Sequence, residues 1–265
     1  MRSVSLSAVA LLLLGTATAS LAQSFEDLLQ DIGDQSSEIR RAYFQPLVDA
    51  SALLASSGTY HTGKSHGLAG FDVGLRMPLV LLTSGDQLGI LSDTPVDVIG
   101  LPMLTANKGL VKGFQVGARL MKMQLNEDVG DVTLYGGSLR WEANEIFHIP
   151  FVMPRIALQA NYSQFKLGES IDTKGMTWDL IVSKKLPLVE FYGGYSTGTM
   201  TGTFDYTFVP QEGVDGIGIH EELDGKVSRL NLGVNVTPLP TLKINGEYGM
   251  GDYNSMSLGL ILSIL

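Results

Sequence analysis

The sequence predicts an all-β protein: an antiparallel transmembrane β-barrel of about ten strands, within a range of about 8 to 12, preceded by a helical leader. Three observations carry this prediction. From residue 68 onward, apolar and polar residues alternate with a period of two. Each alternating segment has roughly the 9 to 11 residues that a transmembrane strand needs. The connections between segments are of two kinds, short and long, and the two kinds alternate along the chain.

Composition excludes several other classes of protein. The chain has 265 residues, 31 glycines and no cysteine, so a disulfide scaffold is excluded. Acidic residues outnumber basic ones 27 to 18, which argues against a nucleic-acid binder. Hydrophobic residues make up 45% of the chain, which argues against disorder. After residue 22 there is no apolar run of the roughly 20 residues that a membrane-spanning helix requires.

Residues 1–22 have the pattern of a secretory signal peptide. Arg2 is followed by an apolar run from Ala8 to Leu14 and then by small residues. Ser20 and Ala22 occupy the −3 and −1 positions of a small-x-small cleavage site, which predicts cleavage before Gln23. We therefore expect an exported protein that resides in the bacterial outer membrane.

Residues 23–57 form the predicted helical leader, because apolar residues recur there at helical spacing. A first stripe comprises Phe25, Leu28, Leu29 and Ile32, and a second comprises Ile39, Tyr43, Leu47, Ala50 and Leu54. Pro46 is expected to kink or restart the second helix. Three interpretations remain open: a helical hairpin packed on its own domain, a plug inside the barrel, or an amphipathic helix lying on the membrane. As plug contacts, Arg40 and Arg41 would pair with inward acids of the barrel, and the expected partners are Asp179, Glu190 and Glu247.

Residues 58–265 form the predicted barrel. Nine alternating segments cover residues 71–77, 114–120, 135–141, 155–163, 176–183, 189–196, 229–236, 242–248 and 256–264, and a weaker one near 94–101 is the candidate tenth strand. Proline-marked short connections at 148–154, 186–188 and 238–241 alternate with polar connections at 126–131, 168–175, 199–225 and 251–254. In outer-membrane barrels the tight turns face the periplasm and the long loops face outward. A soluble β-sandwich or lipocalin-type barrel also alternates, but the aromatic residues at the segment ends favour membrane girdles.

The helical leader, the stretch Gly58-Thr-Tyr-His-Thr-Gly-Lys-Ser-His-Gly-Leu-Ala-Gly-Phe-Asp-Val73 and the Leu-Pro turns together resemble an uncharacterised family of bacterial outer-membrane β-barrel proteins. More distantly, a helical N-terminus that leads into a barrel is similar to fatty-acid-transporter-type barrels. The resemblance implies an outer-membrane barrel without an assigned activity. The expected partners are outer-membrane lipid, the barrel-insertion machinery and a small solute, with no nucleic acid.

No catalytic, cofactor or metal constellation is evident, and we expect no enzyme. The four histidines are His61, His66, His148 and His220. None of them combines with a serine and a carboxylate in the pattern of a hydrolase. Acidic residues around His220 are better explained as a solvated loop than as a calcium site.

Charged residues confined to the polar faces of the strands are the candidate lumen lining. They are Asp72, Arg76, Arg119, Arg140, Arg155, Asp179, Glu190, Arg229, Lys243 and Glu247. A charge on the lipid face costs about 2 to 4 kcal/mol at the membrane midplane, so one-sided placement indicates an inner face. These residues either fill a narrow interior as ion pairs or line a solute path. The sequence therefore predicts a narrow channel or transporter for a small solute, with apolar solutes included. The alternative is a structural or surface-interaction barrel whose loop 199–225 carries the function.

Overall fold

The computed structural model describes residues 36–81, 98–126, 130–147, 153–168, 170–208 and 215–264. The expected signal peptide and the first leader stripe lie outside these residues. The elements are α2 (Ser37–Ser56), β1 (Phe71–Leu81), β2 (Val98–Gly100), β3 (Met103–Gly109), β4 (Phe114–Asn126), β5 (Gly130–Glu142), α3 (Ala143–Phe147), β6 (Arg155–Leu167), β7 (Ile171–Lys185), β8 (Val189–Phe208), β9 (Ile217–Leu239), β10 (Leu242–Gly251) and β11 (Asn254–Ile264).

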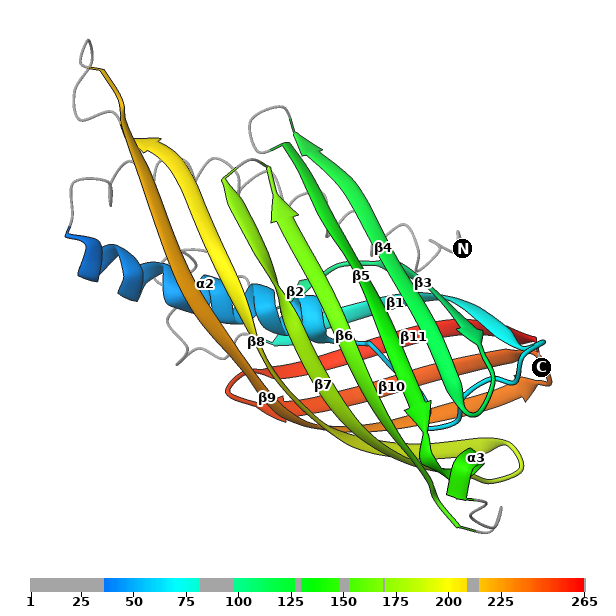
Figure 1. The fold of residues 1–265 in the computed structure, drawn as a ribbon. Helices are drawn as coiled ribbons and strands as arrows, with labels where there is room; N and C mark the ends of the chain where they lie inside the picture. Colours follow the sequence, from blue (N-terminus) through cyan, green and yellow to red (C-terminus); the bar gives the residue numbers. More distant parts are fainter. Residues whose placement is uncertain are drawn as a thin grey trace, which may run out of the picture.

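The strands form one closed antiparallel barrel (Figure 1). Neighbours follow the chain from β11 back to β3 and β1, and β1 pairs with β11 from Phe71↔Ile264 to Leu81↔Asn254. Among the described residues, ten strands make the wall, while β2 pairs only with the last three residues of β1. Closure removes sheet edges, so that backbone groups of the wall pair internally, as a lipid environment requires. The predicted antiparallel barrel of about ten strands with an N-terminal helix is thus confirmed.

Two details of the predicted strand map are wrong. The tenth wall strand is β3 and not the segment near 94–101, in whose described part, residues 98–101, only the short β2 is a strand. The alternation of β3 is weak because Ala106 and Lys108 share the outer face with Leu104. The expected loop at 199–225 is mostly a long β-hairpin, since β8 continues to Phe208 and β9 starts at Ile217. We call the end of the barrel that carries this hairpin the hairpin end, and the opposite end, where β1 begins, the C-terminal end.

The long hairpin was missed because the polarity of its two faces inverts along β8 and β9. Below the inversion, apolar side chains such as Tyr195 and Leu232 face outward. Beyond it, the outward positions of β8 are Thr197, Thr199, Thr201, Thr203 and Asp205, and those of β9 are Ser228, Lys226, Asp224, Glu222 and His220. Over the same stretch the inner face becomes apolar and buried, with Met200, Phe204, Leu223 and Val227. The outer apolar belt therefore ends at the inversion, and the hairpin rises beyond the membrane.

Helix α2 packs against the apolar inner face near the hairpin end (Figure 1). The ring of Phe44 stacks on Phe204 with 4.4 Å between centroids, and Val48 belongs to the same cluster. Further along the helix, a second apolar cluster joins residues 52–55 to wall side chains that include Leu134 and Phe165. The leader helix therefore lies inside the barrel, and the wall surrounds its C-terminal part.

The helix differs from the expected second stripe in two respects. Ile39 is 51% exposed, whereas Phe44 and Val48 are fully buried, because the N-terminal part of the helix contacts the wall through one face only. After about residue 50 the helix is buried on all sides. Pro46 lies inside a single continuous helix and does not restart it. Among the described helices, none is long and apolar enough to cross a membrane.

The outer belt gives a direct test of the membrane-facing surface. Leu180 is 47% exposed on the outer face of β7, between Trp178 and Val182. Leu180→Arg should destabilise the inserted barrel by about 2 to 4 kcal/mol, because it places a charge in the lipid belt. Thr203→Arg, outward on β8 beyond the belt and opposite Glu222, should be tolerated. Urea titration of each variant in lipid vesicles measures both effects, and equal losses would contradict the position of the belt.

Candidate functional site

Residues 37–70 pass through the barrel interior from the hairpin end to the C-terminal end. We call them the plug. Helix α2 forms the first part; the chain then runs without regular structure from Ser57 to Gly70 and enters the wall as β1 at Phe71. Most of the residues between Ser57 and His66 are buried. The backbone groups of such a segment have no neighbouring strand or helical turn to pair with, so the wall must supply their partners.

Two arginines from separate strands bind the last turn of α2. Arg119 on β4 donates from Nη1 to the carbonyl of Ser57 at 3.1 Å and from Nη2 to the carbonyl of Ala55. Arg229 on β9 donates to the carbonyl of Leu53 at 3.3 Å and to the hydroxyl of Ser57 at 2.6 Å. A helix C-terminus has unpaired carbonyls and carries partial negative charge, so guanidinium groups satisfy it in both respects.

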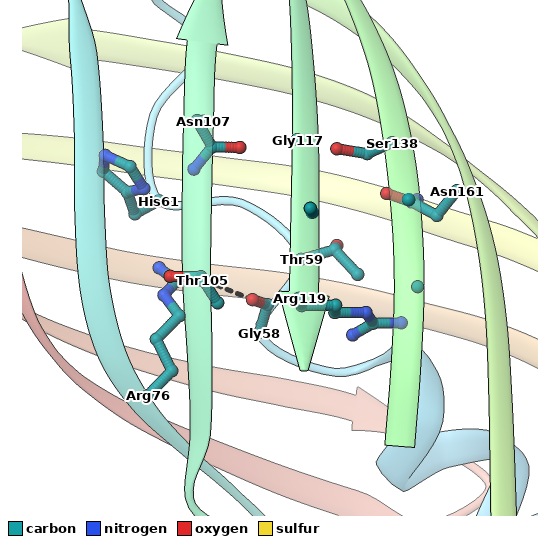
Figure 2. A pocket seen from close by; sticks show the side chains of 13 residues that line it. Gly58, Thr59, His61, Arg76, Thr105, Asn107, Gly117, Arg119, Ser138 and Asn161 are labelled. Carbon is teal, nitrogen blue, oxygen red and sulfur yellow. Dashed lines mark hydrogen bonds between the residues drawn. The ribbon is translucent and has the colours of Figure 1, made fainter. Parts of the chain in front are cut away.

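A third arginine holds the turn that follows the helix. Arg76 on β1 donates from Nη1 to the carbonyls of Gly58 and Tyr60, the latter at 2.8 Å. Figure 2 shows Arg76 and Arg119 approaching this turn from two sides. Gly58 has a φ of 63°, and a Cβ there would lie 2.9 Å from the hydroxyl of Ser257, so the turn requires glycine. The tyrosine hydroxyl accepts a hydrogen bond from Asn231 at 2.9 Å.

Nearer the C-terminal end, acceptors of the wall bind the backbone N–H groups of the plug. The N–H of Gly63 donates to Ser183 at 3.0 Å, and that of Ser65 donates to Glu142 at 2.7 Å. Thr62 donates its hydroxyl proton to Glu190. Arginines therefore bind carbonyls of the plug, while oxygen acceptors bind its N–H groups and the hydroxyl of Thr62.

His66 ends this series of contacts. Its backbone N–H donates to Gln115 at 3.0 Å, and its Nε2 lies 2.6 Å from Asp72 on β1. Asp72 also accepts a hydrogen bond from Asn107 at 2.8 Å, while Nε2 of His61 lies 3.6 Å away. A single buried carboxylate on the first strand therefore anchors the last part of the plug.

Inward glycines give the plug its space. At Gly225 the three atoms nearest to an added Cβ all belong to α2, and the closest, from Val48, would lie at 3.0 Å. At Gly202 a Cβ would lie 2.7 Å from Val48, and at Gly194 it would collide with the hydroxyl of Tyr60. These wall positions are glycine because plug side chains occupy the volume that a wall side chain would otherwise fill.

The structure places every expected lumen residue on the inner face of the wall. They are Asp72, Arg76, Arg119, Arg140, Arg155, Asp179, Glu190, Arg229, Lys243 and Glu247, and all are buried except Arg155 and Lys243, which are partly exposed. Seven of these ten hydrogen-bond directly to the plug: Asp72, Arg76, Arg119, Arg140, Asp179, Glu190 and Arg229.

Arg40 and Arg41 pair with a different acid from those expected. The expected partners Asp179, Glu190 and Glu247 lie further down the lumen, whereas both arginines contact Glu221 of the long hairpin, at 2.9 and 3.5 Å. Sequence reasoning missed Glu221 because residues 199–225 were interpreted as a loop. Glu142 was missed although its parity with Arg140 already places it inward.

The plug leaves little free space around the turn that follows α2. The cavity beside Gly58 and Arg119 has a volume of about 20 Å³, little more than one water molecule needs (Figure 2). Within the part of the chain that the structure describes, no group of three or more His, Asp or Glu side chains is placed to hold a metal ion. The arrangement is therefore a closed barrel with an internal polypeptide plug and an outer apolar belt.

This architecture is that of an outer-membrane β-barrel. The chain belongs to a family of unknown function, DUF6588, whose two matches cover residues 1–88 and 87–264. The membership agrees with the resemblance seen in the sequence. No curated protein matches the chain.

Several solved outer-membrane barrels are similar in fold. The outer-membrane protease OmpT of Escherichia coli is 9% identical, with 76% of this chain and 98% of that chain covered and a TM-score of 0.41. The KdgM porin is 13% identical, with 73% of this chain and 99% of that chain covered and a TM-score of 0.37. The toluene transporter TbuX of Ralstonia pickettii is 11% identical, with 82% of this chain and 77% of that chain covered and a TM-score of 0.33. Similarities this weak carry nothing about activity or solute.

The contact between Gly225 and α2 gives a test of the plug. Gly225→Leu should displace the helix, because overpacking a filled interior typically costs about 1 to 3 kcal/mol. Gly246→Leu is the matched control, since a Cβ at Gly246 meets nothing within 4 Å. The readout is maleimide labelling of Ser51→Cys, a buried position in a chain without cysteine. We expect faster labelling with Gly225→Leu alone, and unchanged labelling there would show that α2 does not fill the interior.

Proposed function

We propose that this protein is an outer-membrane channel for a small solute, held closed by its own N-terminal plug. One observation carries the proposal: a segment of the chain, and not the side chains of the wall, fills the interior. A ten-stranded barrel can be filled by its own inward side chains. This wall instead has glycine at inward positions such as Gly194, Gly202 and Gly225, all in contact with the plug. Withdrawal of the plug would leave an open polar passage, as a transport protein needs and a purely structural barrel does not.

The sidedness follows from the two ends of the barrel. We propose that the C-terminal end, with its tight connections such as 186–188 and 240–241, faces the periplasm. The long hairpin then faces outward and holds the start of α2 through Glu221 and Arg40. The inner face of the hairpin is occupied by α2, which supports a role in holding the plug over a role as a separate interaction surface.

Opening should be controlled by the apolar contacts of α2. Phe44 is fully buried against Phe204, and removing a buried Phe side chain typically costs about 3 to 5 kcal/mol. Phe44→Ala should therefore raise the open probability in potassium chloride across a planar bilayer. Ile39→Ala is the control, because Ile39 is half exposed on the same helix. Heat modifiability on SDS gels verifies that each barrel is folded, and equal conductance of the two variants would contradict gating by α2.

A reversible lock tests whether the current passes where the plug sits. The hydroxyl oxygens of Ser51 on α2 and Thr173 on β7 lie 3.0 Å apart, and the chain has no cysteine of its own. Replacing both by cysteine in the Phe44→Ala background should give a disulfide that ties plug to wall. We expect the oxidised protein to lose the conductance and the reduced protein to regain it. Each single cysteine variant should respond to neither treatment. Conductance that persists in the oxidised, cross-linked protein would overturn the proposed function.

A further inference from the structure

Four arginines of the inner wall have no carboxylate in direct contact, although Asp72, Asp179 and Glu247 lie near enough to interact with them through charge. Arg76, Arg119, Arg140 and Arg229 are all buried, and among the described residues none of them has a carboxylate within the 4.0 Å of a salt bridge. By contrast, Arg40 pairs with Glu221. A buried charge without a charged partner is costly. These guanidinium groups therefore depend on uncharged acceptors, some on the wall, such as Gln159 for Arg140 and Asn245 for Arg76, and the others in whatever occupies the lumen.

In the closed barrel, the occupant supplies oxygen atoms without charge. The four arginines donate to main-chain carbonyls of the plug, among them those of Leu53, Ser57, Tyr60 and Lys64. A carbonyl satisfies the hydrogen bond but not the charge. An anionic oxygen would satisfy both, and hydrogen bonds between charged partners are roughly twice as strong as neutral ones.

Most acids of the same lumen keep a partner on the wall in addition to any contact with the plug. Glu142 pairs with Arg155, whereas Glu190 is held by Thr62 of the plug. Asp72 is bound by His66 and Asn107, and Asp179 accepts from Thr59 and Asn161 through Oδ2, although its Oδ1 has no partner. Glu247 accepts from Tyr192 at 3.0 Å.

The small cavity beside the plug shows the same bias. Arg76 and Arg119 line it together with His61, whose buried Nε2 has no hydrogen-bond partner, and its lining contains no carboxylate (Figure 2).

We infer that the lumen, once the plug has left it, selects small anions as solutes. The chemical class of these solutes is that of carboxylates and phosphates. The oxygens of such a solute would take the places that the carbonyls of the plug hold on Arg76, Arg119, Arg140 and Arg229. Solute and plug would then compete for the same guanidinium groups, so that the solute favours the open state. This inference rests on the proposed function and names the class of solute for it. The inference also argues against an apolar solute, because charged and amide side chains line the lumen at the level of the membrane.

The reversal potential under a potassium chloride gradient tests the inference on the Phe44→Ala protein. We expect chloride to be more permeant than potassium. Added sodium succinate and sodium phosphate, tested separately, should each reduce the chloride current with rising concentration and should raise the open probability. A response to only one of them would identify which oxyanion the path takes.

Variants of the wall assign the selectivity. Arg119→Gln with Arg229→Gln should abolish or reverse the preference for chloride, whereas the double Lys variant at the same positions should keep it. Lys122→Gln with Lys226→Gln is the matched control, because it removes two positive charges from outward positions of the same two strands, β4 and β9. The control should leave the reversal potential unchanged. If the double Gln variant gives no heat-modifiable barrel, Arg119→Gln alone takes its place.

Two kinds of failure are distinguishable. Conductance that the engineered disulfide cannot close would overturn the proposed channel itself. If the disulfide abolishes the current, but the reversal potential shows selectivity for potassium or for neither ion, only the anion inference is overturned. An equal shift in the Lys122 and Lys226 control would also overturn it, since the selectivity would then arise from surface charge.

Discussion

The structure depends on one requirement: the irregular stretch of chain inside the barrel must have partners for its backbone groups. Buried N–H and C=O groups are costly when unpaired, and residues 57–66 have no helix or strand of their own. The wall meets this requirement with arginines for carbonyls, as at Arg76 and Tyr60, and with acceptors for N–H groups, as at Glu142 and Ser65. The charged inner face, which in an empty barrel would suggest a wet pore, is in this state the binding surface for the protein's own chain.

The same principle explains why the polarity of β8 and β9 inverts. The outer face responds to what lies outside, and it changes from lipid-facing Tyr195 to water-facing Thr203. The inner face responds to the plug, and it changes where the plug turns from irregular chain into helix. An apolar helix face needs Phe204 and Leu223, while the backbone of the irregular chain needs polar partners such as Asn235, which donates to the carbonyl of His61. Both changes occur at nearly the same level along β8 and β9. Apolar and polar residues therefore exchange faces there, while their alternation keeps its period of two.

This exchange marks what could and could not be predicted from the sequence. Period-two alternation predicted the closed barrel and the inner face, because lipid on one side imposes a strong and continuous rule. Parity assigns a residue to the inner or outer face but not to a position along the barrel axis. The sequence therefore could not predict Glu221 as the partner of Arg40. Residues 199–208 were interpreted as a loop because threonines took the positions of apolar residues, although Met200 and Phe204 keep the alternation with exchanged parity. The strand β3 was missed because Ala106 and Lys108 weaken its outer face.

In the proposed channel, the two halves of the plug would contribute differently to closure. The polar half exchanges hydrogen bonds to the wall for hydrogen bonds to water when it leaves, and such exchanges typically change the free energy by only about 0.5 to 1.5 kcal/mol each. The apolar half has no such substitute, because burial of Phe44 and Val48 is lost outright when the helix withdraws. In the proposed channel, the helix would therefore supply free energy of closure for which water offers no substitute, while the arginine contacts would hold the polar half in the lumen. An anion that binds the arginines would then act on the half of the plug whose contacts are most easily replaced.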